Sequence, residues 1–179
     1  MDGTTGGYAG LAIESDRGST VENITCENIK MNGITSAFLV WLGNRHEGTP
    51  GVLKNVTIKN IVAENVSLPS AVTGTKFDGK IYETENVLIE NVNIKYRESK
   101  EDIYMREDGV GYEAMIEYPE ITRLSSIYIS SHEESPYWEL PAYGIYLRHS
   151  GNVKIDNFSC TPRSMNTRPQ IYRDNGKEN

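Results

Sequence analysis

Apolar and polar residues alternate with a period of two in a phrase that recurs along the chain. One copy reads KNVTIKNIVAENVS over residues 54–67, and related copies read ENITCENIKM, ENVLIENVNI and GNVKIDNFSC. Such alternation predicts β-strands with one buried face. Each copy nevertheless carries regularly placed asparagines, and asparagine is unfavourable within strands. The asparagines therefore need an explanation of their own.

Aligning the copies places Asn28, Asn60, Asn91 and Asn157 in one column. A weaker copy, SSIYISS, adds Ser131 to that column. The copies follow one another at intervals of a few tens of residues, which is typical of a solenoid in which like segments stack. The irregular intervals indicate loops of different length between the copies.

Four apolar columns accompany the asparagine column, two before it and two after it. Their members are Ile24, Val56, Val87, Ile127 and Val153; Cys26, Ile58, Ile89, Ile129 and Ile155; Ile29, Ile61, Val92 and Phe158; and Met31, Ala63, Ile94 and Cys160. The alternation resumes in phase after the asparagine only if the chain bends there. Because asparagine tolerates the left-handed conformation, we expect it to form corners, with its side chains hydrogen-bonded from copy to copy.

A second family of strands precedes the phrase, at residues 10–15, 37–42 and 143–148. The sequence therefore predicts an all-β parallel β-helix of about five coils, forming one domain over residues 1–179 with a long insertion loop at about residues 97–122. No window shows a sustained helical period, and β-branched residues dominate the apolar set. Cys26 and Cys160 fall in different columns and coils, so we expect two separate core cysteines without a disulfide.

Charge narrows the classes of partner. The chain has 179 residues, a net charge of −7 and a pI near 5.0. Binding to nucleic acid or to an anionic membrane requires a basic surface, so neither partner is expected. No apolar run reaches transmembrane length. No cofactor or metal is expected either, because the sequence contains no phosphate-binding loop and no zinc-ligand spacing.

The outward residues of the second strand family, and the loops that follow these strands, supply the candidate binding residues. They are Glu14, Trp41, Arg45, His46, Tyr146, Arg148 and His149. Aromatic rings can stack on sugar rings, charged groups can bond hydroxyls, and both histidines can titrate near neutral pH. An ordinary solvated face is the alternative interpretation.

Glycoside hydrolysis requires two carboxyl groups that flank the bond. Glu14 with Asp16 is the nearest approach to such a pair on the predicted groove strands, so the catalytic residues are unknown. Glu113, Glu117 and Glu120 lie in the acidic insertion, where solvation is the simpler explanation.

Several phrases resemble the C-terminal half of glycoside hydrolase family 28, the polygalacturonases and related pectin-degrading enzymes, and most of all the bacterial members. The phrases are GLAIESDRGSTVENITCENIKMNGI, WLGNRHEG, LKNVTIKNIVAENVSLPSAVTG, LPAYGIYLRHSGNVKIDNFSC and RPQIYRDN. The resemblance covers residues from about Tyr8 to Asp174. It implies a right-handed parallel β-helix, a polysaccharide or oligosaccharide substrate, inverting hydrolysis by aspartates in the complete protein, no cofactor, and a secreted or periplasmic location.

The chain departs from that family in two ways. The family's Asn-Thr-Asp, Asp-Asp and Gly-His-Gly motifs are absent, so the catalytic aspartates are missing from this chain. The family's Arg-Ile-Lys motif is replaced by Ala12, Ile13 and Glu14, which places a carboxylate where a cation would meet a galacturonate. Two interpretations of the chain therefore stay open. It is part of a pectin-active hydrolase and contributes a groove wall, or it is a non-catalytic β-helix that binds polysaccharide or has a structural role.

The ends of a stack of coils expose strand edges and core residues. The sequence shows no obvious cap at the N-terminal end. We therefore expect the chain to be part of a longer β-helix, or to self-associate through its open ends, or to leave core residues partly exposed there.

Overall fold

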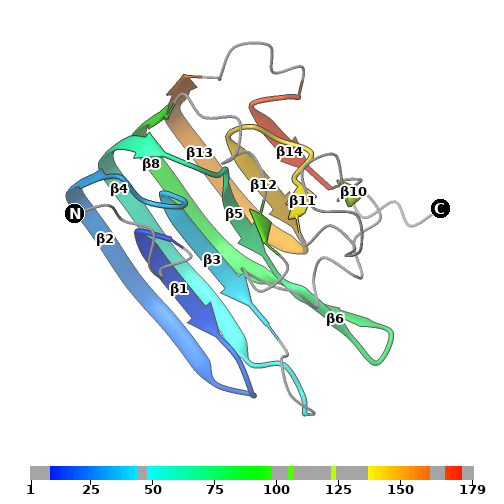
Figure 1. Cartoon of the computed structure of the whole chain (residues 1–179). Helices are drawn as coiled ribbons and strands as arrows, with labels where there is room; N and C mark the ends of the chain where they lie inside the picture. Colours follow the sequence, from blue (N-terminus) through cyan, green and yellow to red (C-terminus); the bar gives the residue numbers. More distant parts are fainter. Residues whose placement is uncertain are drawn as a thin grey trace.

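The computed structural model describes residues 9–43, 48–97, 140–161 and 168–174, and the backbone of three short strands at 105–106, 122–123 and 137–139. This part of the chain is all-β, and no helix occurs within it. The two largest sheets are parallel, and Figure 1 shows them as two layers. The predicted all-β class with parallel strands is confirmed.

The two layers differ in strand length. The short-strand sheet has the order β1 (Leu11–Ser15), β3 (Phe38–Leu42), β5 (Ser70–Thr73), β12 (Ile145–Arg148) and β14 (Ile171–Arg173). The long-strand sheet has the order β13 (Ser150–Thr161), β8 (Thr84–Tyr96), β4 (Val52–Val66) and β2 (Thr20–Asn32). Sequence neighbours such as β1 and β2 lie in different layers, so the chain passes repeatedly from one layer to the other.

Two smaller sheets are antiparallel. β6 (Thr75–Phe77) and β7 (Lys80–Tyr82) form a hairpin that projects beyond the layers (Figure 1). β9 (Met105–Arg106), β10 (Thr122–Arg123) and β11 (Tyr137–Glu139) form a three-stranded sheet. The remainder of the predicted insertion at about residues 97–122 lies outside the described residues, apart from Arg97 at its start.

The predicted apolar columns lie in register across the long-strand sheet. In the first column Ile24 pairs with Val56, Val56 with Val87, and Val87 with Val153. The other three columns pair in the same way through all four strands. In the two middle strands these side chains are buried, because a neighbouring strand covers them on both sides. The period-2 pattern therefore identified both the buried face and the register.

The predicted row for the weaker copy of the phrase, between β8 and β13, is absent from the described long-strand sheet. Its column members Ile127, Ile129 and Ser131 lie outside the described residues, and β8 pairs directly with β13, so no row lies between them. A serine hydroxyl differs from an asparagine amide, which offers separate donor and acceptor groups to the rows on either side. SSIYISS therefore lacks the group that links the other copies.

The asparagine column forms the predicted corners. Asn28, Asn60, Asn91 and Asn157 have φ values of 59°, 55°, 53° and 48°, which lie in the left-handed region. Each amide nitrogen donates to the amide oxygen of the preceding row, at 3.0, 3.1 and 2.7 Å. Asparagine is favoured here because it accepts this backbone conformation and bonds to its neighbours.

A second ladder bends the long strands again, five residues earlier. Asn23, Asn55, Asn86 and Asn152 also have positive φ values, between 53° and 61°. Their amides are linked in the same direction, at 3.0, 3.2 and 2.7 Å. All four long strands share these two asparagine corners, and β4 has a third at Asn65, which has a φ of 52° and donates from Nδ2 to Asn32 Oδ1 at 2.7 Å.

One core lies between the two layers. It contains Ile13, Val40 and Leu147 from the short-strand sheet and Ile58 and Ile89 from the long-strand sheet. Alternation explains the selection, since every second residue of each strand points between the layers.

The two end rows cover this core incompletely. Ile24 and Ile29 in β2, and Ile155 and Phe158 in β13, are only half-buried. Partial exposure at the N-terminal end was one of the two expected outcomes. Association through the ends stays a prediction.

The two cysteines occupy opposite edges of the long-strand sheet, Cys26 in β2 and Cys160 in β13, and both are free thiols. Three strand spacings separate them, which is about 14 Å. A disulfide requires Cα atoms within about 7 Å. The absence of a bond between these two described cysteines agrees with the prediction from their columns.

Substitutions at Asn60 should separate the backbone role of the corner from its side-chain role. Asn60→Gly keeps the left-handed turn but removes two ladder hydrogen bonds, and should cost about 1–3 kcal/mol. Asn60→Ala also forces a Cβ into the left-handed region, which adds about 1 kcal/mol. Urea unfolding measures both changes. Equal stability of the two variants would contradict backbone strain as part of the corner.

Candidate functional site

Strand alternation divides the short-strand sheet into an inner and an outer face. Ile13, Val40 and Leu147 belong to the core between the layers. The intervening residues Trp41 and Tyr146 belong to a separate apolar cluster on the opposite face. The directions predicted for these side chains therefore agree with the observed packing.

The outer face of β3 and β12 is nevertheless covered. Trp41 is 2% exposed and Tyr146 1% exposed, whereas an open groove would leave both rings accessible. They pack with Leu39, Leu68 and Leu140 in what we term the outer cluster. Alternation shows which way a side chain points but not what covers it. As placed, neither ring presents a free face to a sugar, which corrects the expected role of both as open stacking platforms.

The ring of Tyr146 also stacks on Tyr172 of β14, with centroids 6.0 Å apart and planes inclined by 26°. The segment before β12 is fixed over this cluster, because Arg168 Nη1 donates to the Leu140 carbonyl at 2.8 Å. The rings therefore stabilise the outer face of the sheet.

A row that carries two of the predicted charged residues, Glu14 and Arg148, crosses the same sheet. Glu14 pairs with Trp41, Trp41 with Thr73, and Thr73 with Arg148. Asp174, which follows β14, completes this outer row through a salt bridge from Arg148 Nη1 to Asp174 Oδ2 at 3.4 Å. Glu14 lies at the half-exposed end, while Arg148 is 7% exposed.

His149 forms the corner between β12 and β13. It is 6% exposed and has a φ of 47°, the conformation seen at the asparagine corners. Its Nε2 accepts a hydrogen bond from Arg148 Nε at 3.3 Å. Arg148, His149 and Asp174 thus form one polar cluster, in which Arg148 and His149 are buried and Asp174 is partly exposed.

This cluster also holds the base of the β6–β7 hairpin. Gly74 N donates to the Arg148 carbonyl at 2.9 Å, and Thr84 N donates to the His149 carbonyl at 3.1 Å. A Cβ on Gly74 would collide with the carbonyl oxygens of His149 and Tyr82. The backbone carbonyls of Arg148 and His149 therefore fix the point where the hairpin leaves the sheet.

The hairpin has a local sequence signal. Asp78 and Gly79 form its two-residue turn, with φ values of 51° and 73°. Both values are positive, as in the type I′ turn that joins two strands with matching twist. The phrase KFDGKIY, an Asp-Gly pair between strand-forming residues, could have identified this element from the sequence.

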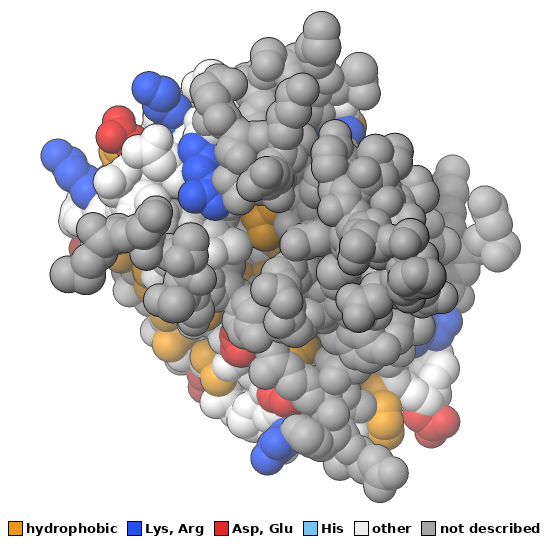
Figure 2. Space-filling model, in the orientation of Figure 1, with side chains coloured by type: hydrophobic (Ala, Val, Ile, Leu, Met, Phe, Trp, Pro, Cys, Tyr) orange, Lys and Arg blue, Asp and Glu red, His pale blue; other side chains and the backbone are white. Residues whose placement is uncertain are grey.

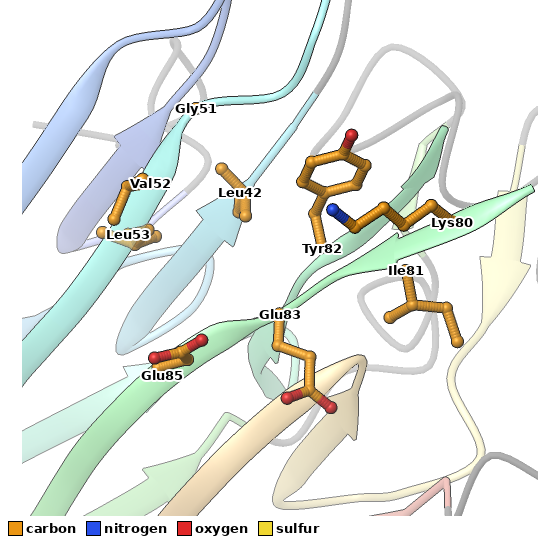
Figure 3. A pocket seen from close by; sticks show the side chains of 9 residues that line it. All are labelled: Leu42, Gly51, Val52, Leu53, Lys80, Ile81, Tyr82, Glu83 and Glu85. Carbon is orange, nitrogen blue, oxygen red and sulfur yellow. The ribbon is translucent and has the colours of Figure 1, made fainter. Parts of the chain in front are cut away.

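A pocket of about 480 Å³ lies between this hairpin and the ends of the two layers (Figure 3). We term it the corner pocket. Its lining residues are Leu42, Gly51, Val52, Leu53, Lys80, Ile81, Tyr82, Glu83 and Glu85. A Cβ on Gly51 would collide with the backbone of Ser19, so glycine allows the β1–β2 turn to approach β4 closely. None of the lining residues was predicted as a site residue.

The polar groups of the corner pocket come from one continuous stretch. The Lys80 ammonium lies over the Tyr82 ring, 5.0 Å from its centroid, and Figure 3 shows both side chains on the same side of β7. Glu83 and Glu85 follow as the chain enters β8, and both are exposed. This set can donate and accept hydrogen bonds beside apolar and aromatic surface.

Paired acids for glycoside hydrolysis do not occur in the outer row. Glu14 and Asp174 lie at its opposite ends, about four strand spacings or 19 Å apart. Carboxyl groups that act together in hydrolysis lie about 5–9.5 Å apart. Asp16 lies closer to Glu14 along the chain, but its Oδ1 accepts from Arg17 N at 2.8 Å within the β1–β2 turn. Glu113, Glu117 and Glu120 lie outside the described residues, as do Arg45 and His46.

The described residues contain no group of three or more His, Cys, Asp or Glu side chains arranged to hold a metal ion. Within the same residues, no helix is long and apolar enough to cross a membrane. On the visible described surface, basic and acidic side chains are interspersed (Figure 2).

Burial makes Cys160 an unreactive thiol. Desolvation raises its pKa to about 11, although the hydrogen bond from Gln170 Nε2, at 3.5 Å, acts in the opposite direction. The pKa of Tyr143 is also raised, first by desolvation and then by the nearby Cys160. A thiol with a raised pKa is a poor nucleophile at neutral pH, so Cys160 has a packing role.

Trp41→Ala should destabilise the fold, because it empties a buried site in the outer cluster. The expected cost is about 3–5 kcal/mol in urea unfolding. Glu14→Gln, in the neighbouring strand of the same row, is the control and should change stability by less than about 0.5 kcal/mol. A Trp41→Ala protein of unchanged stability would show that the ring is accessible after all.

Alkylation of Cys160 by iodoacetamide should follow its raised pKa. About one thiol in a thousand is ionised at pH 8, so the reaction should be slow there and accelerate about tenfold per pH unit towards pH 11. In urea the same thiol should react readily near its ordinary pKa. Mass spectrometry of the peptide measures the rate, and fast alkylation of the folded chain at pH 8 would contradict the burial.

No protein-family model matches the chain, and neither a curated protein nor a solved structure matches it. The outer row and the corner pocket are thus the features from which function is inferred.

Proposed function

We propose that the chain is a right-handed parallel β-helix of the glycoside hydrolase family 28 type and that it binds plant polysaccharide. The observation that carries the proposal is the parallel register of the four apolar columns with two asparagine ladders. The family resemblance of WLGNRHEG and LPAYGIYLRHSG supports the polysaccharide class. The columns and ladders belong to the long-strand sheet, and the two phrases include residues of β3 and β12 in the short-strand sheet.

Binding without hydrolysis is the activity proposed for this chain. The aspartate motifs of the resembled family are absent from the sequence, and the outer row offers no pair of carboxyl groups at a hydrolytic distance. A purely structural β-helix is the second candidate. It is favoured by the burial of Trp41 and Tyr146, which removes two expected sugar-stacking surfaces.

Among the described residues of this region, Glu14 and the lining of the corner pocket are accessible to a ligand. Glu14 is half-exposed on β1, whereas Arg148 and His149 are buried and hold the hairpin base. A polysaccharide that crosses the ends of β1 and β3 would meet the corner pocket next, because Leu42 at the end of β3 lines it. The resemblance also implies a secreted or periplasmic location.

The folded chain should migrate more slowly in affinity electrophoresis through gels that contain a plant polysaccharide. It should release no reducing sugar from these polysaccharides. The panel is polygalacturonan, rhamnogalacturonan, galactan, arabinan and xylan. Retardation without release supports a binding role. Release that Glu14→Gln abolishes would place a catalytic acid in the outer row and overturn the non-catalytic proposal. Migration unaffected by every polysaccharide would favour the structural candidate.

A further inference from the structure

The N-terminal end of the stack presents a long strand edge. β2 is the first strand of the long-strand sheet, and among the described residues it pairs only with β4 (Figure 1). Such an edge offers backbone donors and acceptors to an incoming extended chain, which can add to the sheet as a further strand.

The side chains of β2 that face the core are covered on one side only. They are half-buried, whereas their register partners in β4, such as Ile58 and Ile61, are 0% exposed. The half-buried set is Val21, Ile24, Cys26, Ile29 and Met31. A further row beyond β2 would bury this strip in the way that β8 buries the core side chains of β4.

The opposite end of the stack is closed differently. Arg173 of β14 is in register with Leu147, a core residue, so its side chain lies on the inner face of its sheet. Its Nη2 donates to the Val153 carbonyl in β13 at 3.1 Å. An inward-pointing charge over a strand edge obstructs further pairing. The open edge of the long-strand sheet is therefore that of β2.

The asparagine corners define the hydrogen bonds that a further row must make. The Asn23 and Asn28 amide oxygens accept from Asn55 and Asn60, while their amide nitrogens donate to no described residue. An incoming strand therefore needs two side-chain acceptors, five residues apart, opposite these corners. The amide oxygen of asparagine is such an acceptor, and asparagine also fits the left-handed corner.

Charges on the outer face of β2 select the neighbouring side chains. Glu22 and Glu27 are exposed there, and β4 places Lys54 and Lys59 opposite them. Lys54 bonds to Glu22 at 3.3 Å, and Lys59 bonds to Glu90 of β8 at 3.0 Å. Opposite charges thus alternate from row to row in both columns, and a lysine or arginine beyond β2 would continue the alternation.

A second copy of this chain does not supply the required row. Two β2 edges whose inner faces join must run antiparallel. In that arrangement, alignment of Asn23 with Asn28 of the second copy sets Ile24 opposite Glu27, although these two side chains lie on different faces. The corners and the faces therefore cannot match together, and the β13 edge carries Arg173.

We propose that the β2 edge receives an extended segment of a different protein as a further parallel row. The segment carries a lysine or arginine opposite each of Glu22 and Glu27, followed each time by an asparagine, with apolar residues at the inward positions. Lys30, the remaining charge of β2, lies opposite Val62 in β4, so an uncharged residue suffices there. This contact with a protein goes beyond polysaccharide binding and is independent of it.

A synthetic peptide of residues 51–66, GVLKNVTIKNIVAENV, carries this pattern and serves as the probe. Fluorescence anisotropy should show saturable binding of the labelled peptide to the full chain. A peptide with Lys54→Glu and Lys59→Glu should bind about tenfold more weakly, and the protein variant Glu22→Lys/Glu27→Lys should reverse that preference. Asp156→Lys, in the same column on the β13 edge, is the matched control and should leave binding unchanged.

The native cysteines report which edge is occupied. In a parallel row, position 58 of the peptide lies opposite Cys26, so a peptide with Ile58→Cys should form a disulfide with Cys26 in a glutathione buffer. A peptide with Thr57→Cys points to the other face and should give less than about a tenth of that product. Mass spectrometry of the digested complex identifies the linked thiol.

Several results would overturn the proposal. Linkage to Cys160, or weaker binding after Asp156→Lys, would place the strand on the β13 edge. Binding that ignores both charge reversals would remove the basic partner, and no binding of the peptide would remove the docking edge. A dimer in sedimentation that Glu22→Lys/Glu27→Lys dissociates would assign the edge to a second copy. Polysaccharide binding is measured separately by affinity electrophoresis.

Discussion

The left-handed asparagine corner is the element on which the rest of the structure depends. In this backbone conformation the Cβ of most residues lies too close to the following carbonyl oxygen, which costs roughly 1–2 kcal/mol of conformational free energy per residue. Asparagine meets the cost partly through hydrogen bonds to the rows above and below it, as at Asn60. Because every long strand bends at the same two places, the apolar columns on either side of each bend remain aligned, and one continuous core results.

The same conformation recurs at a different residue where the chain leaves β12. His149 replaces asparagine at this corner, and its ring bonds to Arg148 rather than to another row. Its carbonyl is the acceptor for Thr84 at the start of β8. The corner thus connects the outer row of the sheet to the hairpin and, through the hairpin, to the corner pocket. Two residues predicted as ligand contacts, Arg148 and His149, thus bond through their carbonyls to the base of the hairpin.

Much of the fold could be predicted from local patterns that recur in the sequence. Period-2 alternation predicted the columns, and the tolerance of asparagine for positive φ predicted the corners and one ladder. The weaker copy had the matching alternation, but Ser131 lacks the amide that joins adjacent rows, and β8 pairs directly with β13. The outer cluster could not be predicted, since the direction of Trp41 is local whereas its burial depends on Leu68 and Leu140, distant in sequence. The pocket was not predicted because residues of four strands, β3, β4, β7 and β8, line it, although the sequence does indicate the Asp78–Gly79 turn.

The ladders have a direction. In each of them the amide nitrogen of one row donates to the amide oxygen of the row before it, from Asn152 through to Asn23. The amide dipoles therefore point the same way along the stack, and its two ends are chemically unlike. At the β2 end the ladder ends on the amide nitrogens of Asn23 and Asn28, and at the β13 end on the oxygens of Asn152 and Asn157. A strand that continues the ladders past β2 must present acceptors, and one that continues them past β13 must present donors.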